Sequence, residues 1–214
     1  MVLKVYGSAM STSRVLTTIL EKELPYEFIK VDIAKGEQYN EDYKKLQPFS
    51  KVPVLDDDGF IMYESRAICK YLDRKYPSGK KLTPESDSAA YGRFEQACSI
   101  EQSYFAAAAE TIGTELYIKP VKGLGEPDMA RVAQAEADFD QALGVYEEIL
   151  GKQKYLAGDE FTLADLFHLP NGAALKAGKW NEIFLKYPNV DRWFKGLQAR
   201  ESWVKASAQA GTMP

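Results

Sequence analysis

Residues 47–72 read QPFSKVPVLDDDGFIMYESRAICKYL, and this stretch decides the fold of the first part of the chain. Two β-rich runs, 52–55 and 60–63, flank an acidic turn whose Gly59 suits a positive φ angle, so the pattern predicts a β-hairpin. Ser65 is placed to cap a helix that follows the hairpin. The apolar stripe of that helix consists of Ala67, Ile68, Tyr71 and Leu72.

The residues before the hairpin alternate between strand-like and helical patterns. Residues 3–6 and residues 26–31 are typical of strands, and a helical period separates them over about residues 11–22. Because a strand, a helix and a second strand form a crossover unit, we expect the two strands to be parallel. Residues 1–77 are therefore predicted to be a small α/β domain.

The rest of the chain carries only helical patterns. Residues 78–87 are polar with Gly and Pro, which predicts a linker, and residues 88–214 are predicted to form an all-helical bundle. The stripe of its first long helix consists of Tyr91, Phe94, Cys98, Phe105, Ile112 and Leu116. The stripe of the next consists of Val132, Phe139, Leu143, Tyr146 and Leu150. Glu101 interrupts the first stripe and needs a polar partner if it is buried.

Several polar side chains of the chain are interpreted as structural. Thr162 and Asp165 have the spacing of a capping box at a helix start. The single histidine, His168, lies on that capped helix and is expected to be a satisfied core residue. Cys69 and Cys98 lie on apolar helical faces and make no C-x-x-C pair, so buried thiols are expected and no metal site is predicted.

Composition excludes several classes of protein. The 214 residues carry a formal net charge of −4, and no cluster of five or more Lys and Arg is present, which argues against nucleic-acid binding. The longest strongly apolar stretch, 104–109, is far shorter than the about 20 residues that a membrane span needs. Residues 1–6 do not read as a secretory signal. With two unpaired cysteines, a reducing compartment fits best, and we expect a cytoplasmic location.

Three segments of the first domain have the chemistry of a binding site. Ser11 lies near a helix N-terminus, where free N–H groups stabilise an anion such as a thiolate. A cis bond before Pro53 would turn the Val52 backbone toward an extended peptide ligand. Glu64 and Ser65 open a helix and offer a carboxylate, a hydroxyl and free N–H groups. That combination suits a ligand that has both an ammonium and a carboxylate.

The ordered motifs resemble the cytosolic glutathione transferases, and within them the phi class of plants and fungi. The resemblance covers nearly the whole chain and rests on residues 7–12, 36–37, 47–55, 63–71, 162–166 and 168–171. It implies an N-terminal thioredoxin-like domain, in the order βαβαββα, followed by an all-helical domain. It also implies glutathione as co-substrate, no metal, and a homodimer in which Phe49 is a candidate interface aromatic, with core packing as the alternative.

The resemblance assigns Ser11 as the residue that hydrogen-bonds the glutathione sulfur and favours its thiolate. Ser11 keeps the family distance from Gly7. The segment up to Arg14 is shorter than in the phi pattern, however, and Ser13 keeps the family proximity to Arg14, so Ser13 is the alternate. Either serine can also be a simple N-cap.

The remaining glutathione contacts follow from the same resemblance. Val52 and the cis Pro53 match the positions that pair with the cysteinyl part, and Glu64 and Ser65 match those that hold the γ-glutamyl end. Phi enzymes usually carry a His-Lys pair for the glycyl carboxylate, where this chain has Gln38 and Tyr39. Lys51, in a position where the family often has glutamine, is expected to take over part of that task.

An apolar pocket for the electrophile is expected between the two domains. Met10, Thr114 and Ile118 match lining positions of the phi class, and Ile33 is a further candidate, each with ordinary core packing as its alternative.

The resemblance predicts an enzyme that conjugates glutathione to hydrophobic electrophiles, with peroxidase activity as a compatible side reaction. A binding protein that stores hydrophobic small molecules, and an interaction module of the same fold, are the alternatives. Conjugation that depends on Ser11 would discriminate the enzyme from both.

Overall fold

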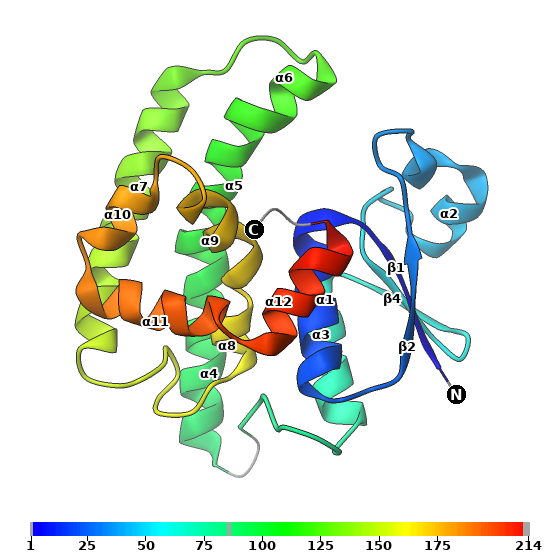
Figure 1. Ribbon diagram of the computed structural model, residues 1–214, viewed down its shortest axis with the longest axis horizontal. Coiled ribbons are helices and arrows are strands. Elements are labelled where there is room, and N and C mark those ends of the chain that lie inside the picture. Colours follow the sequence, from blue (N-terminus) through cyan, green and yellow to red (C-terminus); the bar gives the residue numbers. More distant parts are fainter. Residues whose placement is uncertain (1, 85–86, 212–214) are drawn as a thin grey trace. The chain divides into compact units, whose positions relative to one another are not determined.

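The computed structural model describes residues 2–84 and 87–211. The chain divides into two compact units (Figure 1). The N-terminal unit comprises Met1–Pro84 together with Gln198–Pro214, and the helical unit comprises Glu85–Leu197. The sequence pattern places all residues after the linker in the helical domain, so the C-terminal segment is where the observed division differs from the prediction.

The N-terminal unit is built on a four-stranded mixed sheet in the order β2-β1-β3-β4. Its strands are β1 (Leu3–Gly7), β2 (Tyr26–Lys30), β3 (Val54–Asp57) and β4 (Phe60–Tyr63). Strands β1 and β2 are parallel, whereas β3 is antiparallel to both β1 and β4. Gly59 has a φ of 89° in the β3–β4 turn. The parallel pair and the hairpin are therefore confirmed.

Helices cover both faces of this sheet (Figure 1). The helical elements of this unit are α1 (Ala9–Glu21), the 3₁₀ turn η1 (Glu37–Tyr39), α2 (Glu41–Leu46), α3 (Ser65–Lys75) and α12 (Glu201–Ala210). Helix α1 packs against both α3 and α12. The fully buried core of α1 and α3 consists of Val15, Leu16, Ile19, Ile68, Cys69 and Leu72. The order β1-α1-β2-α2-β3-β4-α3 is the predicted thioredoxin-like fold.

Helix α12 joins the N-terminal unit through an ion pair at its start. Arg200 donates from Nε and Nη2 to the two carboxylate oxygens of Glu21, at 2.6 and 2.7 Å. Ser202 donates to the same carboxylate. Because Glu21 ends α1, these bonds hold the two helices together at that point.

The helical unit begins with one long, nearly continuous helix. Its segments are α4 (Ser88–Ile100), the π-helical η2 (Glu101–Ala106), α5 (Ala107–Gly113), the π-helical η3 (Thr114–Ile118) and α6 (Lys119–Lys122). The remaining helices are α7 (Met129–Leu150), α8 (Leu163–Leu166), α9 (Leu169–Lys176), α10 (Asn181–Leu185) and α11 (Pro188–Gln198). All five residues of the predicted α7 stripe are buried. On the first stripe the prediction is wrong for Tyr91, because its side chain is exposed.

The residues interpreted as structural are buried as expected. Thr162 and Asp165 form the predicted capping box, with the Thr162 N–H donating to Asp165 Oδ2 at 3.0 Å. His168 is fully buried, and its Nε2 atom lies 2.9 Å from the hydroxyl oxygen of Tyr146. Cys69 and Cys98 are free and buried. Burial raises the pKa of the Cys69 thiol to about 11, which leaves that thiol unreactive at neutral pH.

No helix within the described ranges combines the length and the apolar character that a bilayer span requires.

Candidate active site

The register of the sheet gathers the predicted site segments at one edge. Tyr6 of β1 is paired with Val54 of β3, and Val54 is paired with Tyr63 of β4. The residues that follow β1, precede β3 and follow β4 therefore meet at the same end of the sheet. Gly7 is also paired with Lys30, so the segment after β2 starts there too. Four stretches that are distant in sequence thus share one edge.

The turn between β1 and α1 is held in an unusual backbone conformation. Ala9 has a φ of 52°, and Met10, with φ 0° and ψ −95°, is not helical, so regular helix begins only at Ser11. The Thr12 hydroxyl accepts a bond from the Ser8 N–H at 2.9 Å and donates to the Ser8 carbonyl at 3.0 Å. These two bonds fix the turn against the first helical residues.

The two candidate serines have different surroundings. Ser13 is fully buried, and its hydroxyl donates to the Met10 carbonyl at 2.6 Å. Ser11 is partly exposed at the start of the regular helix. A buried hydroxyl that already donates within the protein is not available to a ligand, so the geometry favours Ser11.

The Val52–Pro53 peptide bond is cis, as the family resemblance implied. Pro53 is buried at the start of β3, and Val52 packs on a small cluster that contains Tyr43 and Val54. The Tyr43 hydroxyl donates to the Lys51 carbonyl at 2.7 Å, which anchors this loop from α2. Burial raises the pKa of Tyr43 to about 12, so it remains a donor at neutral pH.

The start of α3 corrects one sequence prediction. Ser65 is the first residue of the helix, and the N-cap position is Glu64, with a φ of 71°. The Glu64 side chain makes no capping bond and is exposed. The Ser65 hydroxyl is occupied differently, because it accepts a hydrogen bond from Arg14 Nη1 at 2.8 Å. The Glu64 side chain therefore does not cap the N–H groups in the first turn of α3.

Gln38 and Tyr39 lie in η1, on the segment that follows β2. Gln38 is buried, and its amide Nε2 is 3.4 Å from the Ile33 carbonyl, while its Oε1 has no hydrogen-bond partner among the described residues. Tyr39 and Lys51 are exposed. Lys51 brings a cation to this edge of the sheet, next to the cis proline.

Comparison with known proteins identifies the family. The glutathione S-transferase N-terminal domain family matches residues 1–74, and the C-terminal domain family matches residues 101–201. Glutathione S-transferase hmp2 from Hypomyces subiculosus is 72% identical over 211 residues, which cover 98% of this chain and 100% of that protein. The chain belongs to the glutathione S-transferase family. It is a glutathione transferase, and glutathione is its co-substrate.

Solved structures of phi-class relatives agree with the whole fold of the transferase. Glutathione transferase F1 from poplar superposes with a TM-score of 0.91 at 33% identity, and all of each chain is covered. Glutathione S-transferase I from maize, in complex with an atrazine glutathione conjugate, superposes with a TM-score of 0.89 at 32% identity, again over all of each chain. The predicted resemblance to the phi class is thereby confirmed.

The four predicted electrophile contacts of the transferase are solvent-accessible. Met10 and Ile33 are exposed on the N-terminal unit, and Thr114 and Ile118 are exposed on η3 of the helical unit. Ordinary core packing, the alternative for each, is therefore wrong.

Two residues of the site were missed by the sequence analysis. Thr12 fixes the turn before Ser11, and Arg14 reaches Ser65 from the buried side of α1. The signal for Arg14 was present, since an arginine directly precedes the apolar Val15 and Leu16 of a helix whose stripe faces the core. A buried charge needs a polar partner, but the sequence alone does not show that this partner is Ser65.

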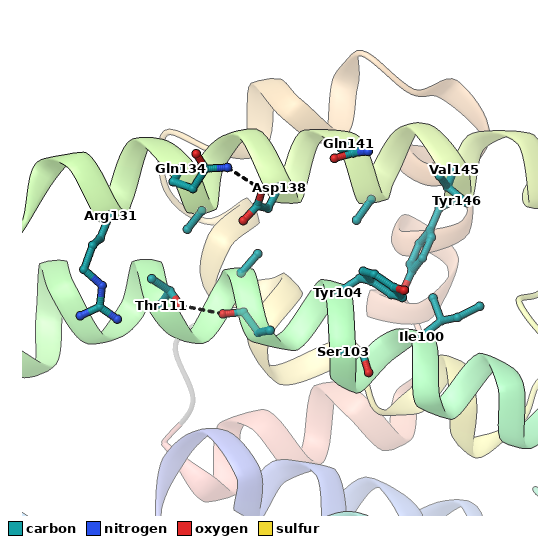
Figure 2. A pocket seen from close by; sticks show the side chains of 14 residues that line it. Ile100, Ser103, Tyr104, Thr111, Arg131, Gln134, Asp138, Gln141, Val145 and Tyr146 are labelled. Atoms are coloured by element: carbon teal, nitrogen blue, oxygen red, sulfur yellow. Dashed lines mark hydrogen bonds between the residues drawn. The ribbon is translucent and has the colours of Figure 1, made fainter.

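A large groove of the transferase lies on the helical unit (Figure 2). It has a volume of about 810 Å³ and runs between the α4–α5 segment and α7. Four alanines, Ala107, Ala108, Ala135 and Ala142, line it together with larger side chains such as Tyr104 and Val145. None of the predicted glutathione or electrophile residues lines this groove. Among the residues that the structure describes, no group of His, Cys, Asp and Glu could hold a metal ion.

Proposed function

We propose that Ser11 activates glutathione by donating a hydrogen bond to its sulfur. The observation that carries this assignment is the contrast between the two serines: Ser11 is partly exposed, whereas the Ser13 hydroxyl is buried and bonded to the Met10 carbonyl. A hydroxyl donor beside the sulfur stabilises the thiolate more than the thiol. A free thiol has a pKa of about 8.5, and each unit of depression corresponds to about 1.4 kcal/mol.

The rest of the tripeptide follows the edge of the sheet. The Val52 backbone, directly before the cis Pro53, pairs with the cysteinyl part of glutathione. Glu64 and Ser65 hold the γ-glutamyl end, where the exposed Glu64 carboxylate faces the ammonium and the start of α3 faces the carboxylate. At the glycyl end Lys51 supplies the positive charge, with Gln38 and Tyr39 as neutral neighbours.

The bound thiolate then attacks an electrophilic carbon. A carbon–sulfur bond forms with the sulfur electron pair, and in a substitution the leaving group departs with the electrons of its own bond. Met10, Ile33, Thr114 and Ile118 are the side chains that contact the electrophile. Their mainly apolar character suits hydrophobic substrates.

Titration of the bound thiol tests this assignment. With glutathione bound, Ser11→Ala is expected to raise the thiol pKa by about one unit or more and to lower kcat/KM roughly 10- to 100-fold. The pKa is read from the thiolate absorbance, and kcat/KM from conjugation of a chloronitroaromatic. Ser13→Ala is the matched control, with an expected change in kcat/KM below about threefold. If Ser13→Ala shifts the thiol pKa and Ser11→Ala does not, the assignment of the two serines is reversed.

We also propose that the transferase is a homodimer. Phe49 supports this, because its side chain is 67% exposed in the single chain. The alternative of core packing for Phe49 is wrong. The alanine-rich groove adds a second apolar surface, and its lining includes both Arg131 and Asp138. Opposite charges on one surface suit a two-fold contact, in which each copy presents the same patch.

We infer a cytoplasmic location from the two free, buried thiols, which fit a reducing compartment. Cell fractionation with compartment markers tests it, and recovery of the protein in a secreted or organellar fraction would contradict it.

A further inference from the structure

One hydrogen bond joins α1 and α3 beneath the proposed glutathione site. Arg14 Nη1 donates to Ser65 Oγ at 2.8 Å. Arg14 is 2% exposed and Ser65 is 7% exposed, so the bond is shielded from water. It connects the helix that carries Ser11 to the helix that starts at the proposed γ-glutamyl position.

The chemistry of the two groups fixes the direction of this bond. A guanidinium has only donors, whereas a hydroxyl has one proton and can accept through its lone pairs. Ser65 Oγ must therefore accept from Arg14, and its own proton points to another group. Within residues 2–84 and 87–211, Ser65 Oγ makes no other hydrogen bond that would use this proton.

We propose that Arg14 is a positioning residue that makes Ser65 a donor toward glutathione. By occupying the acceptor side of the Ser65 hydroxyl, Arg14 leaves the proton for the α-carboxylate of the γ-glutamyl end. The proposal rests on the role proposed above for Ser65. It adds that Ser65 meets the ligand as a hydrogen-bond donor, because one lone pair of its hydroxyl already accepts from Arg14 and its proton is not used by the residues that the structure describes.

The identity of the residue matters for this role. A guanidinium stays charged at all accessible pH values and holds its N–H groups in a rigid plane, whereas a lysine ammonium is a flexible point charge. Arg14 also lies one helical turn after Ser11 on α1. Helix α1 therefore carries both the Ser11 hydroxyl, which bonds the sulfur, and the Arg14 guanidinium. That guanidinium orients the Ser65 hydroxyl toward the carboxylate.

A double-mutant cycle on ligand binding tests the proposal. The probe is S-methylglutathione, which has no ionisable thiol, so its affinity does not depend on thiolate formation at Ser11. Calorimetric titration would compare the wild type, Arg14→Lys, Arg14→Met and Ser65→Ala, and the combinations of each Arg14 variant with Ser65→Ala. We expect Arg14→Met to weaken binding about tenfold and Arg14→Lys about threefold when Ser65 is present. In the Ser65→Ala background either change should be below about twofold.

Several readouts separate positioning from a merely structural effect. Arg200→Lys, which alters another partly buried Arg bond of the same unit, is the matched control and should leave the affinity unchanged. Arg14→Lys should raise KM for glutathione while kcat at saturation stays within about twofold. Thermal unfolding shows which variants are folded. If Arg14→Met does not fold, the double-mutant cycle is evaluated with Arg14→Lys alone.

Two results would overturn the proposal. One is a loss of affinity that is the same with Ser65 present as in the Ser65→Ala background, because Arg14 would then act without the hydroxyl. The other is an Arg14→Lys variant that binds S-methylglutathione as tightly as the wild type. Failure of the wild type itself to bind S-methylglutathione would instead contradict the proposed glutathione contacts, and with them the role of Ser65 on which this proposal rests.

Discussion

Gly7 is the residue whose size determines how closely β1 approaches α1. A Cβ atom at this position would lie 2.4 Å from Thr12 Oγ1 and 2.5 Å from Thr12 Cγ2. The Thr12 hydroxyl occupies that space because it bonds both the N–H and the carbonyl of Ser8. The absence of a side chain at Gly7 therefore lets the turn close in front of Ser11.

Gly7→Ala is expected to displace Thr12 and with it the turn that presents Ser11. We expect a loss of about 1–3 kcal/mol in the free energy of unfolding, as for other overpacked sites. Because Ser11 moves, kcat/KM should also fall, by more than for the same substitution at Gly92, where a new Cβ would have open space. Chemical denaturation and conjugation kinetics measure the two effects. Equal behaviour of the two variants would contradict the role given to Gly7.

At the scale of elements, Asp165 shows how one side chain can join several segments. Its Oδ1 accepts from the Leu156 N–H and from Trp193 Nε1, both at 3.0 Å. Its Oδ2 accepts from the N–H and the hydroxyl of Thr162. The capping box that the sequence predicted is therefore also a tie between α8, α11 and the loop before α8.

Asp165→Asn is expected to destabilise the transferase more than Thr162→Ala. An amide would replace one acceptor oxygen with an NH2 group that faces the two donors bonded to that oxygen, at a cost of roughly 3 kcal/mol. Thr162→Ala should cost about 1 kcal/mol, the usual value for a lost cap. Denaturant midpoints at constant m-value give both numbers. The reverse order would show that the cap, not the tie to α11, dominates.

The contact between α1 and α12 carries a pH dependence. Burial alone would raise the pKa of the Glu21 carboxyl, but the hydrogen bonds from Arg200 and Ser202 outweigh it and hold this pKa below its ordinary value. A carboxyl whose folded pKa is lowered contributes stability above its unfolded pKa of about 4.3. That contribution is lost as the pH falls through the folded pKa.

Glu21→Gln should therefore be less stable than the wild type at pH 7, by roughly 1–2 kcal/mol. The difference in free energy of unfolding should shrink as the pH falls below about 4.3, because the unfolded carboxyl then takes up a proton that the folded carboxyl, with its lowered pKa, does not yet bind. Unfolding by urea at a series of pH values measures it. A difference that stays constant down to the acid limit would contradict the assignment of the pH effect to Glu21.

At the scale of the whole molecule, the proposed dimer depends on surfaces that a single chain leaves uncovered. Stable interfaces usually bury about 1,200–2,000 Å² in total, with aromatic residues as frequent anchors. Phe49 and Phe60 are both exposed aromatics of the N-terminal unit, and Phe49 is the more exposed, at 67% against 51%. Each ring meets one tyrosine of its own chain, and the Phe60–Tyr71 contact is the closer, at 5.2 Å against 6.1 Å.

Phe49→Ser is expected to shift the transferase from dimer to monomer, whereas Phe60→Ser should leave the oligomeric state unchanged. An interface anchor that is truncated costs about 2 kcal/mol or more, which is roughly 30-fold in the dissociation constant. Sedimentation equilibrium over a range of concentrations measures that constant. A wild type that sediments as a monomer would contradict the dimer itself.

Local patterns in the sequence determined most of the architecture. The β-hairpin, the parallel strand pair, the helical second unit and the capping box follow from side-chain period and turn chemistry, which act over a few residues. The cis bond before Pro53 was an expectation of the family resemblance, which rests on the ordered motifs.

Only the tertiary structure decided which groups of the site face one another. It buried the Ser13 hydroxyl against Met10, left Ser11 accessible, and moved Ser65 from the predicted cap position to the partner of Arg14. It also placed α12 in the N-terminal unit. The physical reason is that these choices depend on packing between residues far apart in the chain, such as the 179 positions that separate Glu21 from Arg200, and no local period encodes such contacts.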